Sequence, residues 1–259
     1  MAKYCVIIPT HGRPSLLARA IRSVKEQSFT DVTVIVVSDE RAMDSFSAAR
    51  RLLSGEDIFV QRGGEPGPAP SRNMGLTLAT ADYVSFLDDD DELPKDFFAQ
   101  ADALIGNATD HVCFTNFSVV YDADSRTVTK GTPPALIDLG GKLLDEVQIT
   151  NFIANSCLIY PLAAIRGKAF DPSLVLNEDW DFLLGALTAR PLRHLPIDGP
   201  IIHKTDRARQ DRRGAVNDHL LPEIFLRIYK KRPAPTDALR AARQSFFAAK
   251  GMVLPIEYF

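Results

Sequence analysis

Short apolar runs alternate with helix-periodic segments along the first hundred residues, and this alternation restricts the chain to few folds. The runs Tyr4–Ile8, Val32–Val37 and Tyr83–Leu87 are too short for helices, and their apolar character is typical of strands buried on both faces. Between the first two, Ser15–Gln27 repeats apolar residues at the spacing of an amphipathic helix, with Ser15 expected as its N-cap. Strands and helices that alternate over short links predict an α/β fold, a doubly wound and mostly parallel sheet flanked by helices.

The remaining elements have weaker signals. Arg62–Pro70 contains three glycines and three prolines and is expected to be a loop, after which Ser71 would cap a helix over Asn73–Thr80. The second half is less regular and ends in two amphipathic helices. The further expected elements are helices at Ala42–Leu53, Pro94–Leu104, Trp180–Ala189, Leu220–Lys231 and Ala238–Lys250, and strands at Ile58–Val60, His111–Tyr121, Cys157–Tyr160 and Pro200–His203.

Four consecutive aspartates, Asp88–Asp91, follow the strand Tyr83–Leu87 directly, and Glu92 comes next. Such crowding of like charge is costly unless a cation is present, and a hard divalent ion removes that cost. The end of a strand in an α/β sheet is also where ligands usually bind. If the strand continues, alternation places Asp88 and Asp90 on one side, where a metal ion and a diphosphate could lie between them. The cluster therefore predicts a metal–phosphate site and an enzyme, and the simpler alternative is a solvated acidic loop.

Three further segments place polar residues at strand or helix ends. Pro9-Thr10-His11 follows the first strand and could face a nucleotide, although a plain turn is equally expected. Asp39 follows the second strand and could accept a hydrogen bond from a base or ribose, or cap a helix. Arg72 near a helix N-terminus suits a diphosphate or a base, or lies solvated. The first strand–helix turn lacks the Gly-x-Gly-x-x-Gly pattern, which argues against a dinucleotide-dependent oxidoreductase.

A second acidic segment, Asn177-Glu178-Asp179, opens an expected helix. Its carboxylates either stabilise the helix N-terminus, an effect of ~0.3–1 kcal/mol, or supply a general base. His203 ends a short apolar strand. A lone histidine is more often structural, but with carboxylates nearby it can be a metal ligand.

In this order, the motifs resemble the inverting glycosyltransferases of family 2, which adopt the GT-A fold. Each motif is moderately specific, the ordered set is highly specific, and the resemblance covers about residues 4–205. The motifs are Pro-Thr-His-Gly-Arg-Pro after the first strand, Val-Ser-Asp-Glu, Ser-Arg-Asn-Met-Gly-Leu, Phe-Leu-Asp-Asp-Asp-Asp-Glu-Leu-Pro and Asn-Glu-Asp-Trp-Asp-Phe. One departure is that His11-Gly12 replaces the aromatic-Asn pair usual after the first strand.

The resemblance implies a role for each matching position. Asp39 would hydrogen-bond a uracil, Asp179 would be the catalytic base, and Asp90 and His203 would hold Mn²⁺ or Mg²⁺. The run of aspartates leaves the register of the Asp-x-Asp pair, taken as Asp88 and Asp90, open by one residue. The implied donor-binding residues are Pro9, Thr10, His11, Asp39, Arg72 and Asp88.

These assignments predict metal-dependent, inverting transfer of a sugar from a nucleotide-sugar donor, with a UDP-sugar favoured, to an acceptor hydroxyl. Two other classes stay open: a sugar nucleotidyltransferase and a non-catalytic nucleotide-sugar-binding protein. Residues 1–105 would form the nucleotide-sugar-binding half of the GT-A domain, residues 106–213 the acceptor and catalytic half, and residues 214–259 a C-terminal helical appendage. Neither the sugar nor the acceptor is identified by any motif.

Composition bears on partners and compartment. The formal net charge of −3 gives no global basic field for nucleic acid. The three cysteines are odd in number and far apart, which indicates reduced core residues. No apolar run approaches the ~20 residues that span a bilayer, and a strand begins within four residues of the N-terminus, so no signal peptide is expected. We therefore expect a cytoplasmic protein without a transmembrane segment.

Overall fold

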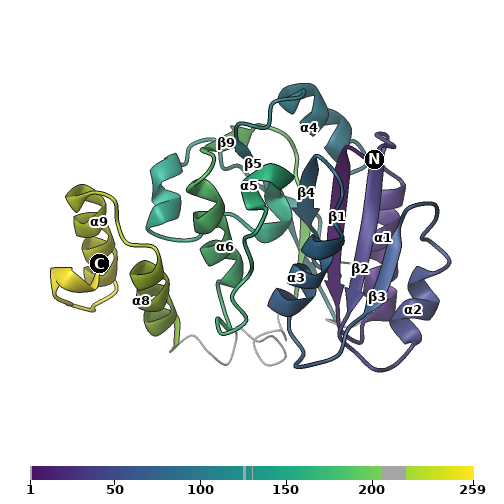
Figure 1. Cartoon of the computed structure of the whole chain (residues 1–259), viewed down its shortest axis with the longest axis horizontal. Coiled ribbons are helices and arrows are strands. Elements are labelled where there is room, and N and C mark those ends of the chain that lie inside the picture. The colour runs from purple at the N-terminus through teal and green to yellow at the C-terminus, as the bar shows by residue number, and fades with distance from the viewer. Residues whose placement is uncertain (1, 125–126, 130, 206–219) are drawn as a thin grey trace.

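The computed structural model describes residues 2–124, 127–129, 131–205 and 220–259. Its centre is a seven-stranded sheet in the order β3-β2-β1-β4-β8-β5-β9 (Figure 1). Neighbours among β1 to β4 pair in parallel, as do β5 and β9, whereas β8 runs antiparallel to β4 and β5. The predicted mostly parallel α/β sheet is thus confirmed. The strands are β1 (Tyr4–Thr10), β2 (Val32–Ser38), β3 (Ile58–Gln61), β4 (Tyr83–Phe86), β5 (Val112–Thr115), β8 (Leu158–Pro161) and β9 (Leu192–Leu195).

Both faces of the sheet are buried, because side chains of β1 alternate between two hydrophobic cores. Cys5 and Ile7 belong to one core, which α3 and α6 cover, while Val6 and Ile8 belong to the other, which α1 and α4 cover. This two-sided burial explains why the strand is apolar at successive positions. The helices are α1 (Pro14–Lys25), α2 (Asp44–Ala49), α3 (Pro68–Leu78), α4 (Phe97–Ile105), α5 (Leu162–Ile165) and α6 (Glu178–Leu187).

At the start of α1 and of α3, a proline begins the helix earlier than the sequence analysis predicts. α1 begins at Pro14, so Ser15 lies inside the helix and is not its cap. α3 begins at Pro68, so Ser71 also lies inside, where its hydroxyl donates to the Gly67 carbonyl oxygen at 3.0 Å. Proline is favoured at a helix start because its φ is already helical and its missing N–H would have no partner there. The proline therefore decides each boundary, and the serine does not.

A second, three-stranded sheet lies next to the acidic segment. Its order is β10-β6-β7, with β10 and β6 parallel. Glu92 forms an isolated antiparallel bridge with Ile201, which attaches β10 to the chain just after the aspartates. The β-rich segment predicted at His111–Tyr121 is divided between the two sheets. The strands are β6 (Phe117–Asp122), β7 (Ala135–Ile137) and β10 (Ile201–Thr205).

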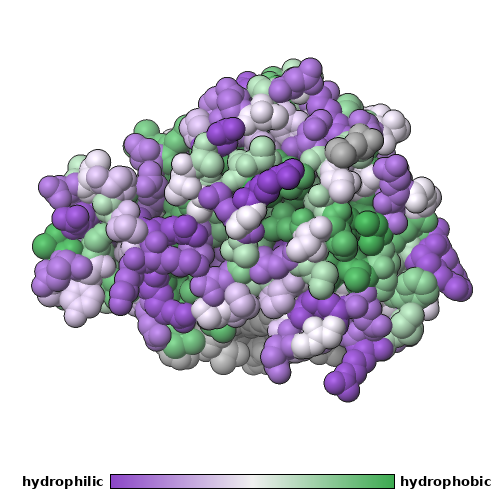
Figure 2. Space-filling model, in the orientation of Figure 1, coloured by the Kyte–Doolittle hydropathy of each residue, from purple (hydrophilic) through white to green (hydrophobic). Residues whose placement is uncertain are grey.

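At the opposite end of the molecule from β1–β3, α8 packs against α6, and α9 packs against α8 (Figure 1). Trp180 of α6 contacts Phe225, with ring centroids 4.7 Å apart. Hydrophilic side chains gather over the outward side of α8 (Figure 2). Within the described parts of the chain, no helix has the length and apolar character needed to cross a bilayer. The remaining helices are α8 (Leu221–Lys231) and α9 (Asp237–Ala248), with short 3₁₀ turns η1 (Leu144–Gln148), η2 (Asn155–Cys157) and η4 (Ile256–Tyr258).

Candidate active site

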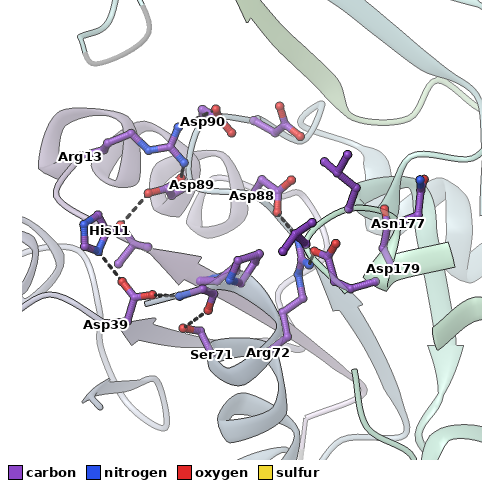
Figure 3. A pocket seen from close by; sticks show the side chains of 18 of the residues that line it. His11, Arg13, Asp39, Ser71, Arg72, Asp88, Asp89, Asp90, Asn177 and Asp179 are labelled. Atoms are coloured by element: carbon purple, nitrogen blue, oxygen red, sulfur yellow. Dashed lines mark hydrogen bonds and ion pairs between the residues drawn. The ribbon is translucent and has the colours of Figure 1, made fainter. Parts of the chain in front are cut away.

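A cavity of about 770 Å³ opens where β1, β2 and β4 end (Figure 3). It is lined by eight of the nine residues to which the sequence analysis assigns donor binding, metal binding or catalysis. The exception is His203, although its neighbour Ile202 contributes to the lining. The eight are Pro9, Thr10, His11, Asp39, Arg72, Asp88, Asp90 and Asp179.

The four aspartates form a turn that follows β4, and they alternate between burial and exposure. All four line the cavity, but Asp89 and Asp91 are buried, with 1% and 4% of their surfaces exposed, whereas the other two are partly exposed. Asp89 accepts a hydrogen bond from the Thr10 hydroxyl at 2.6 Å, and Asp91 accepts one from the Ser156 hydroxyl at 2.9 Å. The two buried aspartates therefore attach the loop to the rest of the protein.

Three carboxylates of this loop are close enough to share a cation. One oxygen from each of Asp88, Asp90 and Asp91 lies within 4.8 Å of the others. Oxygen donors of this kind suit Mg²⁺ and Mn²⁺. Both oxygens of Asp91 already accept hydrogen bonds, from Ser156 and from the backbone N–H of His203 at 3.1 Å. The partly exposed pair is therefore the better candidate, in the register expected from the sequence.

Burial first, and the crowding of charge second, raise the pKa values of the two buried aspartates. Burial raises the pKa of Asp89 to about 7; the Arg13 guanidinium opposes this shift and the charge of Asp90 adds to it. Burial, followed by the charges of Asp90 and Asp88, raises the pKa of Asp91 well above its ordinary range. Arg13, which the sequence analysis did not single out, donates to both Asp89 and Asp90, the latter at 2.8 Å. Arg13 and Arg72 are still outnumbered by the four carboxylates, and a divalent cation would supply further positive charge.

Arg72 joins the two acidic segments across the cavity (Figure 3). One of its nitrogens donates to Asp88 at 2.8 Å and another to Glu178 at 2.7 Å. Its side chain is buried. α3 can present Arg72 here because it packs closely on β1 at Gly75, where a Cβ would collide with the Ile7 side chain. A single guanidinium thus holds both clusters in one site.

The start of α6 forms another wall of the cavity. Asn177 precedes the helix in the left-handed region, with φ 57°, which asparagine adopts more readily than most residues. Asp179 accepts a hydrogen bond from the backbone N–H of Trp180 at 2.8 Å. Burial and the charge of Glu178 raise the pKa of Asp179 to about 7, against the effect of Arg72. A carboxylate with this pKa is suited to accept a proton from a hydroxyl near neutral pH.

Asp39 lies at the end of β2 in a nest of donors. Its Oδ2 accepts hydrogen bonds from the backbone N–H of Gly67 at 2.6 Å and from Arg62 at 3.1 Å. Its Oδ1 lies 2.6 Å from Nδ1 of His11. The Asp39 carboxylate is 4% exposed, whereas the His11 ring is 58% exposed. A ligand that reaches Asp39 from the cavity would therefore meet His11 first.

His203 lies behind the aspartate loop, away from the candidate metal group. Its Nδ1 is 2.7 Å from Asp122 and its Nε2 is 2.9 Å from Glu92. Arg19 extends this network, with its guanidinium 3.5 Å from Glu92 and a hydrogen bond to the Asp90 carbonyl oxygen. The structure therefore brings the backbone of His203 to the loop, but not its ring to the oxygens of the metal group.

Two functional candidates escaped the sequence analysis, which named Glu178 but not its contact with Arg72. Arg13 stands inside the motif Pro-Thr-His-Gly-Arg-Pro, so its charge gave a signal that could have been used. Arg62, which supports Asp39, lies in a Gly/Pro-rich loop where no pattern identifies its partner.

Comparisons with known proteins agree with the motif order. A family model described as "Glycosyl transferase family 2" matches residues 5–166. The GalNAc(5)-diNAcBac-PP-undecaprenol beta-1,3-glucosyltransferase of Campylobacter jejuni is 40% identical over 96 residues, which are 36% of this chain and 31% of that protein. Succinoglycan biosynthesis protein ExoW of Rhizobium meliloti is 30% identical over 197 residues, 69% of this chain and 61% of that protein. The chain thus spans between about a third and just under two thirds of these relatives.

Solved structures share the fold. Staphylococcus aureus TarS 1-349 in complex with UDP-GlcNAc aligns with a TM-score of 0.69 at 18% identity, over 95% of this chain and 71% of that chain. The mannosyltransferase PcManGT from Pyrobaculum calidifontis, in complex with GDP-Man and Mn²⁺, aligns with a TM-score of 0.56 at 18% identity, over 99% of this chain and 77% of that chain. At this identity the likeness shows the fold alone, and it confirms the predicted GT-A architecture.

Proposed function

The chain belongs to glycosyl transferase family 2, and from this membership we propose that it transfers a sugar from a nucleotide-sugar donor to an acceptor hydroxyl, inverting the anomeric carbon. The observation that carries the proposal is the cavity in which Arg72 bridges Asp88 and Glu178. This arrangement supports an anionic diphosphate bound beside Asp179, a carboxylate whose pKa is raised to about 7. Charge stabilisation of a leaving group and a general base are the two requirements of a single inverting displacement.

The donor would lie along the ends of β1 and β2. The turn Pro9–His11 lines this part of the cavity, and Asp39 lies at the side of the cavity opposite Asp179 (Figure 3). We propose a uridine nucleotide, because a carboxylate can accept a hydrogen bond from the uracil N–H. Oδ2 of Asp39 already accepts two hydrogen bonds, so the base would share Oδ1 with His11 or displace its exposed ring.

The residues present fit a bound Mn²⁺ or Mg²⁺. Asp90 and Asp88 would hold the ion, which would offset the charge that grows on the leaving nucleoside diphosphate. Both ring nitrogens of His203 are already hydrogen-bonded, so His203 would ligate the ion only after leaving Asp122 or Glu92. We therefore assign the metal first to the aspartates.

Asp179 would perform the proton transfer. Its carboxylate accepts the proton of the acceptor hydroxyl as the oxygen attacks the anomeric carbon from the face opposite the diphosphate. The bond from that carbon to the diphosphate oxygen breaks in the same displacement, and the nucleoside diphosphate leaves. Inversion follows because a single attack reaches only the opposite face.

Calorimetry and donor hydrolysis test the proposal together. We expect UDP to bind more tightly with Mn²⁺ than with EDTA and more tightly than GDP. UDP release from UDP-GlcNAc or another UDP-sugar should require metal. Asp90→Ala should lose the metal effect without a lower melting temperature, whereas the matched control Asp82→Ala, an exposed residue at the opposite end of β4, should retain it. Equal UDP affinity with and without metal would contradict the metal assignment, and pyrophosphate release from a nucleoside triphosphate and a sugar phosphate would indicate a nucleotidyltransferase instead.

A further inference from the structure

Arg13 contacts two aspartates of the cavity, one of them buried and the other partly exposed. Its guanidinium donates to Asp89 through one terminal nitrogen and to Asp90 at 2.8 Å through the other (Figure 3). The Arg13 side chain is 31% exposed and lines the cavity. The roles proposed for the neighbouring residues leave this cation unassigned.

The contact with Asp89 is an anchor. The Asp89 carboxylate is 1% exposed, and its second oxygen accepts a hydrogen bond from the Thr10 hydroxyl at 2.6 Å. Removing a partner from a buried carboxylate is costly, because water cannot replace it. Breaking the contact between Arg13 and Asp89 would therefore cost more free energy than breaking a contact with an exposed carboxylate.

The contact with Asp90 can be exchanged. The Asp90 carboxylate is 17% exposed, lines the cavity and belongs to the group of oxygens that could hold a cation. A carboxylate that turns toward a divalent ion no longer needs a guanidinium to balance its charge. The nitrogen that it leaves remains beside the cavity, held there by the anchor on Asp89.

We propose that Arg13 exchanges partners during substrate entry: it holds Asp90 while the site is empty and binds the donor diphosphate once Asp90 has turned to the metal. This inference rests on the proposed function, because it requires a metal and a diphosphate in this cavity. The exchange is chemically matched, since a guanidinium recognises carboxylate and phosphate oxygens with the same forked geometry. Arg13 then acts as an internal competitor for metal and as a ligand for donor.

The exchange makes metal and donor bind cooperatively. When metal binds alone, Arg13 loses its ion pair with Asp90 and gains no other partner. When metal binds together with a diphosphate, the diphosphate replaces Asp90 as the partner of Arg13. By thermodynamic linkage, the donor must strengthen metal binding by the same factor by which metal strengthens donor binding. Removing Arg13 should therefore tighten binding of metal alone and weaken binding of the metal-assisted diphosphate.

Three variants separate exchange from general electrostatics and from a structural role. Arg13→Ala removes both contacts, and Arg13→Lys keeps the charge but cannot hold two carboxylates in a fork. Arg22→Ala removes an exposed arginine of α1, the helix that Arg13 precedes, and is the control. Thermal melting and circular dichroism establish whether each variant is folded. If Arg13→Ala does not fold, Arg13→Lys still allows the test.

Calorimetry measures Mn²⁺ alone, UDP with EDTA, and UDP with saturating Mn²⁺. We expect Arg13→Ala and Arg13→Lys to bind Mn²⁺ alone more tightly than the wild type, and Arg13→Ala to bind UDP with Mn²⁺ roughly tenfold more weakly, the effect of one charge-assisted hydrogen bond. Arg22→Ala should match the wild type.

Three results would contradict the exchange. If Arg13→Lys binds Mn²⁺ with the same affinity as the wild type, the exchange is overturned, because charge alone would then explain the effect of Arg13→Ala. Weaker binding of Mn²⁺ alone by both Arg13 variants would overturn it in favour of a structural role. If wild-type UDP affinity is the same with Mn²⁺ and with EDTA, the proposed metal dependence fails, and the inference fails with it for that separate reason.

Discussion

Burial and the charge of Glu178 together raise the pKa of Asp179 to about 7, against the effect of Arg72. A base is active only when deprotonated, so the rate should rise with pH through this value. We expect the donor-hydrolysis rate at saturating UDP-sugar and Mn²⁺ to increase with a slope of about one and to level off above about pH 7. UDP binding, measured over the same range, is the control for effects on the donor. A rate that stays flat from about pH 6 to pH 8 would place the base elsewhere.

Substitution of the same residue separates chemistry from binding. Asp179→Asn keeps the size of the side chain but removes its basic oxygen, so turnover should fall by ~10²–10⁴-fold while UDP affinity changes little. Stability gives a second readout. A carboxylate whose folded-state pKa is raised stabilises the folded state at low pH and loses that contribution as pH rises toward 7. Asp179→Asn should therefore melt higher than the wild type above pH 7, and the difference should shrink in acid. An unchanged turnover rate would direct attention to Glu178.

His203 illustrates a residue whose partners decide its role. Its ring lies between Asp122 and Glu92, and the Asp122 carboxylate is 4% exposed. We expect His203→Ala to lower the free energy of unfolding by about 1–3 kcal/mol, because a buried carboxylate loses its donor. Mn²⁺ affinity should change by less than roughly threefold, and His111→Ala, at a more exposed position, should change neither. A large loss of Mn²⁺ affinity without a loss of stability would support His203 as a metal ligand.

At the scale of elements, α8 holds α6 in position through a buried carboxylate. Asp181, with 0% of its side chain exposed, accepts hydrogen bonds from Lys231 at 2.6 Å and from Arg232 at 2.9 Å. Gly185 leaves room for the guanidinium, since a Cβ there would lie 2.8 Å from an Arg232 nitrogen. The ion pair lies two residues beyond Asp179 along the same helix, so it can set the position of the base.

The prediction for this contact concerns both stability and turnover. Arg232→Ala should destabilise the protein by about 1–3 kcal/mol, because Asp181 is left buried with one cation that is itself partly exposed. Turnover should fall more than UDP affinity, since the donor half of the cavity is unaffected. Lys230→Ala, at an exposed position of the same helix, is the control. Combining Arg232→Ala with Asp181→Asn should give a non-additive loss, and strict additivity would show that the two residues do not act through each other.

At the scale of the whole molecule, one hydrophobic core extends through all three regions expected from the sequence. It contains Phe86 of β4, Trp180 of α6, and Tyr229 and Phe259 from the C-terminal segment. The expected boundary between residues 213 and 214 lies outside the described residues. A shared core argues that residues 220–259 fold together with the rest and do not form a separate appendage.

Truncation tests that interpretation. A chain ending at residue 219 would expose Trp180 and remove the cations that pair with Asp181. We expect the truncated chain to lose cooperative thermal unfolding, as measured by circular dichroism. An unpaired buried carboxylate and an exposed hydrophobic core both destabilise the folded state. Val253→Ser in the full chain, at a position 89% exposed, should melt like the wild type. If the truncated protein melts cooperatively near the melting temperature of the full chain, residues 220–259 would form a separate appendage, as the sequence analysis expects.

Sequence alone determined the α/β architecture and the order of the motifs, because strand and helix periods and the charge of short segments are local properties that adjacent residues carry. It also identified eight residues that line the cavity, since the ends of parallel strands meet at one edge of the sheet. Only the tertiary structure decided which aspartates of the loop are buried, which carboxylates share Arg13, and where the ring of His203 lies. The contacts of Arg13 with Asp90, Arg72 with Glu178, and His203 with Asp91 join residues 77, 106 and 112 positions apart. No local pattern records such pairs, because their distance depends on how the whole sheet and its helices pack.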